Sequence, residues 1–210
     1  RRVGIKTTQT VFDIIESIQK SDGASVPELA ERVGLAKSTV HNHVKTLLNR
    51  GYLTEEGGEY FLGLKFLEAG YKAENNRSIS QFSDQAVRDL ANKTGETAWV
   101  VVEEHGKAVY LQGSGGENAL RTRLDHVGLR THLHFTASGK AILACLSRNR
   151  VETIIDRHGL PSATEQTITD QEELFKELDQ IGERQVAFAD EEAVEGLRSV
   201  AVPVKPDGDI

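Results

Sequence analysis

Several features are missing from this sequence of 210 residues, and each absence narrows the class of protein. Its one cysteine, Cys145, cannot form an internal disulfide, which is typical of a reducing compartment. No apolar run reaches the roughly 18 residues that a transmembrane helix needs, and the N-terminus lacks the apolar stretch of a secretory signal. We therefore expect a cytoplasmic protein that does not enter a membrane.

Methionine is also absent, even at the first position, so we expect the chain to be part of a longer gene product. Hydrophobic residues make up 38% of the sequence, which is enough to build compact cores. Internal repeats and low-complexity tracts are not found. The length then predicts one or two globular domains.

The third absence is local: residues 32–54 contain no acidic side chain. The net charge of the chain is −7, yet residues 1–75 are neutral, and the whole acidic excess follows residue 75. The acid-free window carries two histidines and four basic residues, Arg32, Lys37, Lys45 and Arg50. Such a positively charged window favours binding to the phosphate backbone of a nucleic acid. A chance gap between acidic residues is the alternative.

Hydrophobic spacing predicts a winged helix-turn-helix in residues 1–64. Apolar residues at helical spacing indicate a helix over 11–18, and Ser25 to Glu28 has the form of a capping box that opens a second helix. Gly34 supplies the short turn before a third helix that begins near Lys37. Two short strands, residues 52–54 and 59–62, are joined by a glycine-containing turn and form the wing.

The third helix has the composition of a DNA-reading helix. Val40, Val44 and Leu47 form its buried stripe. The residues on or beside its exposed face are Lys37, Ser38, Thr39, His41, Asn42 and Lys45. Short hydrogen-bonding side chains can reach base edges and phosphates, and lysine adds positive charge. The alternative is a winged helix that binds protein or serves a structural role. The acidic wing tip, residues 55–59, is expected to add little phosphate attraction.

The remaining sequence predicts a linker helix over residues 65–80 and a second domain over 81–210. The expected strands are residues 97–104, 107–112, 120–124, 186–188 and 199–204. The expected helices of this domain include residues 136–146 and 148–158, and one opened by a capping-box pattern at Thr169 to Glu172. Strands and helices mixed without a regular βαβ rhythm favour an α+β domain on an antiparallel sheet.

These segments resemble the IclR family of transcription regulators along nearly the whole chain. In the first domain the resemblance depends on VPELAERVGLAKSTVHNHVKTLLNRGYL and YFLGLKFLEAG. In the second it depends on GLRTHLHFTASGKAILACL, TITDQEELFKELDQI and FADEEAVEGLRSVAVPV. The order and spacing of the second-domain segments are more specific than the helix-turn-helix, which many families share. Relatives continue past VAVPV with another strand and a helix, so we expect an incomplete C-terminal end.

The resemblance implies a regulator that binds double-stranded DNA, with a GAF-like domain that binds a small organic effector, commonly a carboxylate or an aromatic catabolite. It also implies a homodimer or homotetramer, no cofactor and no enzymatic activity. The residues that match the family's effector site are Leu120, Arg123, Ala137, Ser138, Asp190, Leu197 and Ser199.

From the residues alone, the segment 136–139 has two interpretations. It leads into a helix, so its backbone N–H groups could meet a carboxylate, with charge added by Arg121 and Arg123. Alternatively, Ser138 and Gly139 only cap the helix and the arginines are solvated. Acidic residues 190–192 argue against a strongly anionic effector unless Arg123 or Arg198 compensates.

The sequence favours three other interpretations less, and two of them, a metal site and an enzyme, stay open as alternatives. The segment HFTASGKA lacks the first glycine and the Ser/Thr of a phosphate-binding loop, so Lys140 is expected to pack or pair within its domain. A metal site would use His126, His132, His134 and Cys145, but these form no tight motif, and an apolar helix favours a buried Cys145. A small-molecule enzyme would need a catalytic set in the second domain, and the spacing reveals none.

Overall fold

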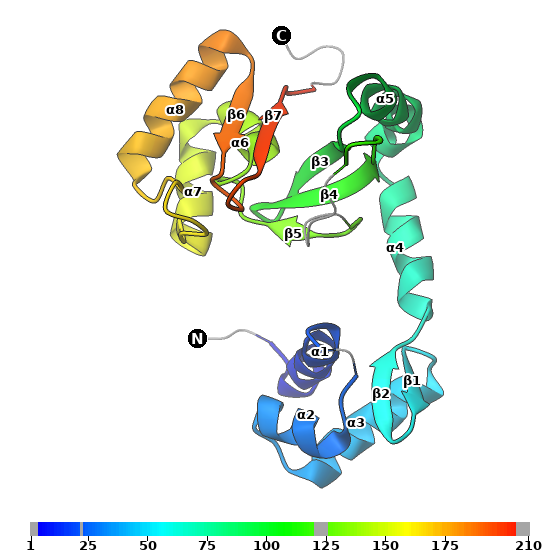
Figure 1. Ribbon diagram of the computed structural model, residues 1–210. Helices are drawn as coiled ribbons and strands as arrows, with labels where there is room; N and C mark the ends of the chain where they lie inside the picture. The colour runs from blue at the N-terminus through cyan, green and yellow to red at the C-terminus, as the bar shows by residue number, and fades with distance from the viewer. Residues whose placement is uncertain (1–3, 22, 120–125, 205–210) are drawn as a thin grey trace. The chain divides into compact units, whose positions relative to one another are not determined.

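The computed structural model describes residues 4–21, 23–119 and 126–204 of the chain. Its elements form two compact units, Arg1–Asn76 and Arg77–Ile210 (Figure 1). The division falls inside the segment 65–80 that we predicted as a linker helix, at a break between two helices. Whether this segment acts as a separate linker stays a prediction.

The first unit is a three-helix core with a two-stranded wing. Its elements are α1 (Lys6–Gln19), α2 (Val26–Val33), α3 (Lys37–Asn49), β1 (Leu53–Glu56), β2 (Glu59–Leu62) and α4 (Lys65–Asn75). Its fully buried apolar side chains include Ile14 and Ile18 of α1, Leu29 of α2 and Val40 of α3. They recur at three- and four-residue intervals because one face of each helix meets the others. The helix-turn-helix order is therefore as predicted, with α3 beginning at Lys37.

Glycines in the left-handed region make two of the turns of this unit, the one before α3 and the one in the wing. Gly34 has a φ of 66° and ends α2, so α3 follows within three residues. Gly57 and Gly58 have φ values of 61° and 88° and join β1 to β2, whose Glu56 faces Glu59. Positive φ at both central residues is the geometry that matches the twist of a two-residue hairpin. The structure confirms the predicted wing.

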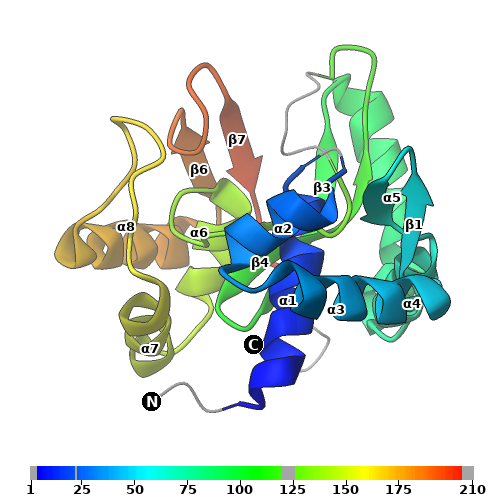
Figure 2. The same ribbon diagram turned by 90° about the horizontal axis from the view of Figure 1, so that it is seen from below.

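The second unit is α+β, as predicted from the mixed pattern. Its elements are α5 (Ser78–Thr94), β3 (Ala98–Glu104), β4 (Lys107–Ser114), β5 (Arg130–Thr131), α6 (Ala137–Ala144), α7 (Arg148–His158), α8 (Gln171–Arg184), β6 (Ala187–Asp190) and β7 (Arg198–Ala201). In the described ranges, β3, β4 and β5 form one antiparallel sheet and β6 with β7 another. Figure 1 and Figure 2 both place α6 between α8 and the β3–β4 hairpin, which it also contacts.

Helix α5 and the β3–β4 hairpin are joined by specific contacts. The Gln112 side chain donates to the Ser80 carbonyl oxygen at 3.0 Å and accepts a hydrogen bond from the Ser83 hydroxyl. On the same hairpin, Trp99 pairs with Gly113, where an added Cβ would lie 2.4 Å from the indole ring. Gly113 therefore leaves the space that the ring occupies.

Two local predictions in this unit are wrong. Asp170, not Thr169, caps α8: its carboxylate accepts a hydrogen bond from the Glu173 N–H at 2.9 Å. A charged carboxylate at this position also faces the positive end of the helix dipole.

The second wrong prediction concerns Cys145, which is exposed rather than buried because it lies at the end of α6. The predicted strand 120–124 lies outside the described residues. In the described part of the chain, no helix is long and apolar enough to cross a membrane.

Candidate functional site

Helix α3 presents its polar residues to solvent and its apolar residues to the core. Val40 and Val44 are 0% and 1% exposed, and Leu47 is also buried. The predicted DNA-binding residues Lys37, Ser38, Thr39, His41, Asn42 and Lys45 are all exposed. The structure therefore brings the six onto accessible parts of one helix. Their contact with DNA stays a prediction.

The N-terminus of α3 is suited to negative charge. Its N-cap residue, Ala36, offers no side-chain acceptor, and the first turn contains no acidic residue. N–H groups in the first turn of a helix lack intrahelical acceptors and favour phosphate oxygens. Near the middle of the helix the Thr46 hydroxyl donates to the backbone carbonyl oxygen of Asn42 at 2.8 Å. This hydrogen bond involves the backbone of Asn42 and not its side-chain amide.

A cavity of about 490 Å³ opens in the second unit. One wall is the start of α6, and the others come from β3, β4, the end of α5, and β7 with the segment leading into it. Four residues predicted from the family resemblance line it: Ala137, Ser138, Leu197 and Ser199. They come from two segments about sixty residues apart in sequence, and the fold brings them to one space.

Of the other three predicted effector residues, only Asp190 falls in the described part of the chain. Leu120 and Arg123 lie outside the described residues. Asp190 is not among the lining residues; its Oδ1 accepts a hydrogen bond from Arg198 Nε at 2.6 Å. That bond is the main cause that raises the pKa of the Arg198 guanidinium. Arg198 does line the cavity, so Asp190 acts on the rim through its neighbour.

Sequence reasoning missed the aromatic wall of the cavity. Trp99 and Tyr110 line it, with ring centroids 5.3 Å apart in an edge-to-face arrangement. Leu90 and Thr94 of α5 add to the same side. One signal was available: Trp99 is the only tryptophan of the chain. Spacing could not show which side of the hairpin the indole would take.

The start of α6 bears on the two interpretations of segment 136–139: the helix is capped by Thr136 and not by Ser138 and Gly139, and the binding of a carboxylate stays a prediction. The cap is Thr136, whose hydroxyl oxygen accepts a hydrogen bond from the Gly139 N–H at 3.1 Å. Thr136, Ala137 and Ser138 nevertheless lie on the cavity wall. N–H groups of a first helical turn have no intrahelical acceptor, so those of Ala137 and Ser138 are directed toward the cavity end of the helix.

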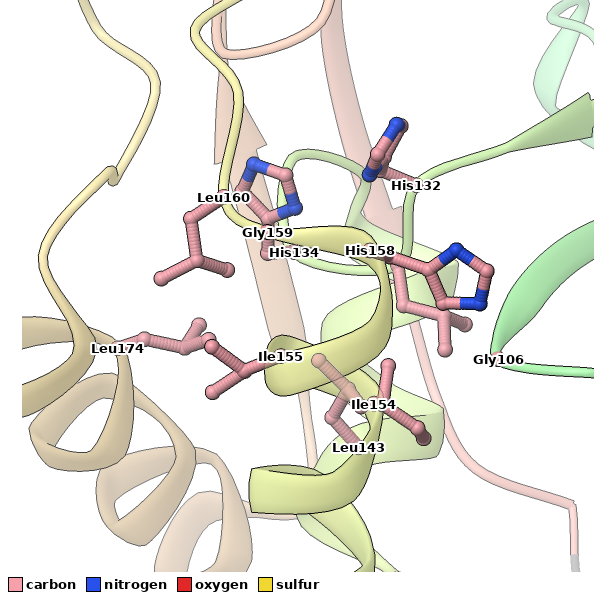
Figure 3. Close-up of a pocket in the computed structure, with 11 residues that line it drawn as sticks. Gly106, His132, His134, Leu143, Ile154, Ile155, His158, Gly159, Leu160 and Leu174 are labelled. Atoms are coloured by element: carbon pink, nitrogen blue, oxygen red, sulfur yellow. The ribbon is translucent and has the colours of Figure 1, made fainter. Parts of the chain in front are cut away.

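Two of the histidines proposed for the metal alternative, His132 and His134, line a different space. They lie with His158 and several apolar side chains around a volume of about 10 Å³, enough for about one water (Figure 3), and His126 and Cys145 are not among the residues that line it. His134 Nε2 lies 3.1 Å from the Pro161 carbonyl oxygen. Burial, with Lys107 nearby, lowers the pKa of His132 to about 4. Among the described residues no group of three or more histidine, cysteine or acidic side chains could hold a metal ion.

The two units together define the class of protein. The first presents an exposed, acid-free helix on a winged helix-turn-helix, and the second holds a cavity of the size that takes a small organic ligand. The class is a helix-turn-helix transcription regulator with a second, ligand-binding domain.

Comparison with known families makes this specific. The IclR helix-turn-helix domain matches residues 9–57, and the bacterial transcriptional regulator IclR C-terminal domain matches residues 72–207. The chain belongs to the IclR family and is a DNA-binding transcriptional regulator of that type. The HTH-type transcriptional regulator KdgR of Escherichia coli K12 is 33% identical over 202 residues, covering 95% of this chain and 76% of that protein. The transcriptional repressor IclR of the same strain is 28% identical over 193 residues, covering 90% and 70%.

Solved structures share the fold. The IclR of Thermotoga maritima has a TM-score of 0.73 at 27% identity and covers 96% of this chain and 82% of its own. An IclR homologue from Microbacterium hydrocarbonoxydans, solved in complex with 4-hydroxybenzoate, has a TM-score of 0.78 at 21% identity and covers 97% and 85%. At that identity the second likeness concerns the fold alone.

Proposed function

We propose that this regulator binds its operator through α3 and is switched by a small organic acid bound in the second-unit cavity. The observation that carries the proposal is the cavity itself. It combines Trp99 and Tyr110, which suit an apolar or planar body, with the first turn of α6 and Arg198, which suit a carboxylate. The homologue solved with 4-hydroxybenzoate supports a ligand of this chemistry.

Switching requires that the ligand prefer one arrangement of the protein. A ligand with equal affinity for the DNA-bound and free forms would change nothing. We propose that the protein acts as a homodimer or homotetramer, since two copies of α3 would then read two half-sites about one DNA turn apart. Effector binding would change the spacing of the two helices through α4. As a regulator of transcription it would work in the cytoplasm without catalysing a reaction.

The test is a fluorescence-anisotropy titration on a labelled duplex from the region upstream of the protein's own gene. At moderate salt we expect tighter binding to this duplex than to a scrambled duplex of equal length. Adding 4-hydroxybenzoate and a panel of other small carboxylates is expected to shift the affinity in at least one case. Equal binding to both duplexes would overturn the proposal that the protein recognises an operator in this region. An affinity that no acid of the panel changes would overturn the switch.

A further inference from the structure

A buried ion pair joins two segments, α6 and the connection between β6 and β7, that contribute other residues to the walls of the cavity. Lys140 of α6 is 1% exposed, and its Nζ lies 2.6 Å from Glu192 Oε1 and 3.5 Å from Glu177 Oε1. An ammonium group out of water is strongly unfavourable unless it is paired. The prediction that Lys140 packs or pairs within its domain is therefore confirmed. Its nearer partner, Glu192, lies in a different segment of the fold from α6. A buried pair adds little stability compared with apolar side chains, and its best-attested gain is to specify one arrangement.

Glu192 is the second residue of the connection between β6 and β7, residues 191–197, which we name the β6–β7 loop. Its carbonyl oxygen accepts hydrogen bonds from the hydroxyls of Thr167 at 2.7 Å and Thr164 at 3.3 Å. The loop closes on itself, because the Glu191 N–H donates to the Leu197 carbonyl oxygen at 2.9 Å. Glu191 has a φ of 58°, a left-handed conformation that a non-glycine residue adopts only when its surroundings impose it. The loop is thus held in one specific shape from its first residues.

Neither partner of the pair lines the cavity, but both are close in sequence to residues that do. Lys140 follows Ser138 by two residues on α6, and Glu192 directly precedes Ala193. Ser138 lies on one wall, and Ala193, Gly196 and Leu197 lie on another. The bond between Lys140 and Glu192 therefore crosses from the helical wall to the β6–β7 loop.

We propose that Lys140 and Glu192 are positioning residues of the cavity, whose ion pair holds the β6–β7 loop against α6 and sets how closed the cavity is. The biological meaning of that closure rests on the proposed function. The geometry predicts an asymmetry between the partners. Without Lys140, the Glu192 carboxylate is buried without its cation, and its Oε2 has no hydrogen-bond partner among the described residues. If the loop opens, water can hydrate the Glu192 carboxylate. Helix α6 cannot move in the same way, because Ala137 and Ala141 are packed in the core, so the loop is the part that is expected to open.

The cavity contains its own reporter. Trp99 is the only tryptophan of the chain and lines the same cavity as the loop. Acrylamide, a small neutral quencher, reaches the indole more often when the loop opens. The quenching constant of Trp99 fluorescence, divided by the fluorescence lifetime, therefore measures cavity access without any effector.

Four variants of the full chain give the test. Lys140→Met is expected to raise the acrylamide quenching constant about twofold, because the loop then opens locally. Glu192→Gln keeps an acceptor for Lys140 and is expected to raise it less. The double variant Lys140→Met with Glu192→Leu removes both charges and is expected to return the constant toward wild type. Lys176→Met, an exposed lysine on α8, is the matched control and is expected to leave it unchanged.

A merely structural role predicts another result. Lower melting temperatures for folded Lys140→Met and Glu192→Gln, with quenching constants equal to wild type, would overturn the proposal. If Lys140→Met does not fold, Glu192→Gln alone decides, since it preserves the size of the side chain. The outcome is independent of the proposed switch. A wild-type protein whose DNA affinity responds to no acid would overturn the switch and leave the quenching result standing.

Discussion

A Cβ atom added to Gly139 would lie 2.1 Å from the carbonyl oxygen of Leu133. The same Cβ would lie 2.6 Å from the Leu133 Cα, so the obstacle is backbone and cannot rotate away. Helix α6 thus approaches the segment before it more closely than any side chain allows. This contact fixes the helical wall of the cavity, because Ala137 and Ser138 precede Gly139 on the same turn.

Gly139→Ala is expected to destabilise the second unit in spite of the higher helix propensity of alanine. Overpacking a buried contact costs about 1–3 kcal/mol, which exceeds the roughly 0.5–1 kcal/mol that alanine gains over glycine in a helix. Urea unfolding followed by Trp99 emission measures the difference. The control is Gly182→Ala on α8, where an added Cβ meets nothing within 4 Å and a small gain in stability is expected. A Gly139→Ala protein as stable as wild type would contradict the close approach.

The next prediction separates phosphate contact from base contact on α3. Lys45→Ala is expected to weaken binding to all DNA sequences and to reduce the slope of log affinity against log salt by about one. Asn42→Ala is expected to cost about 1–3 kcal/mol on the operator and much less on scrambled DNA, because amide side chains read base edges. Anisotropy titrations at several salt concentrations measure both effects.

Lys93→Ala is the control for Lys45→Ala. It removes the same charge from an exposed position at the end of α5, in the second unit. We expect its operator affinity and salt slope to match wild type. If Lys45→Ala and Lys93→Ala reduce affinity equally, the net charge of the chain, and not α3, governs DNA binding.

The helix-turn-helix could be predicted almost completely from the sequence, because its signals are local. The start of α3 at Lys37, the turn at Gly34 and the glycine turn of the wing each follow from a few neighbouring residues. The cavity could be predicted only in part. The family resemblance predicted four of its lining residues, Ala137, Ser138, Leu197 and Ser199. It did not predict Trp99 and Tyr110, which line the cavity because of how the β3–β4 hairpin packs. The Lys140–Glu192 pair joins residues 52 positions apart, which no spacing rule predicts.

Arg198 is expected to set the affinity for an anionic effector. Its side chain is 75% exposed on the cavity rim, and its bond to Asp190 is a surface pair that adds little to stability. Arg198→Ala is therefore expected to leave the melting temperature nearly unchanged and to weaken the effector response about tenfold, the loss of one charge-assisted hydrogen bond. The measurement is the acid concentration that gives half of the change in operator affinity. Arg157→Ala, an exposed arginine of α7, is the control and is expected to behave as wild type.

Asp190→Asn is expected to act in the opposite direction. It removes the negative charge that competes with the effector for Arg198 Nε, so the same acid should act at a lower concentration. If Asp190→Asn weakens the response instead, Asp190 contacts the effector directly, as the family resemblance implied.

The histidine cluster predicts how stability depends on pH. Burial lowers the pKa of His132 to about 4, with further lowering by Lys107, His134 and His158, whereas the unfolded chain keeps a value near 6.5. Above that value both states are neutral at His132 and its titration has no effect. As the pH falls from about 6.5 toward 4, the unfolded state gains a proton that the folded state does not, so the free energy of unfolding decreases. His132→Gln removes this group from the titration. Urea unfolding between pH 7.5 and pH 4.5 is expected to show a shallower loss of stability for His132→Gln than for wild type, and parallel curves would show that His132 titrates normally in the fold.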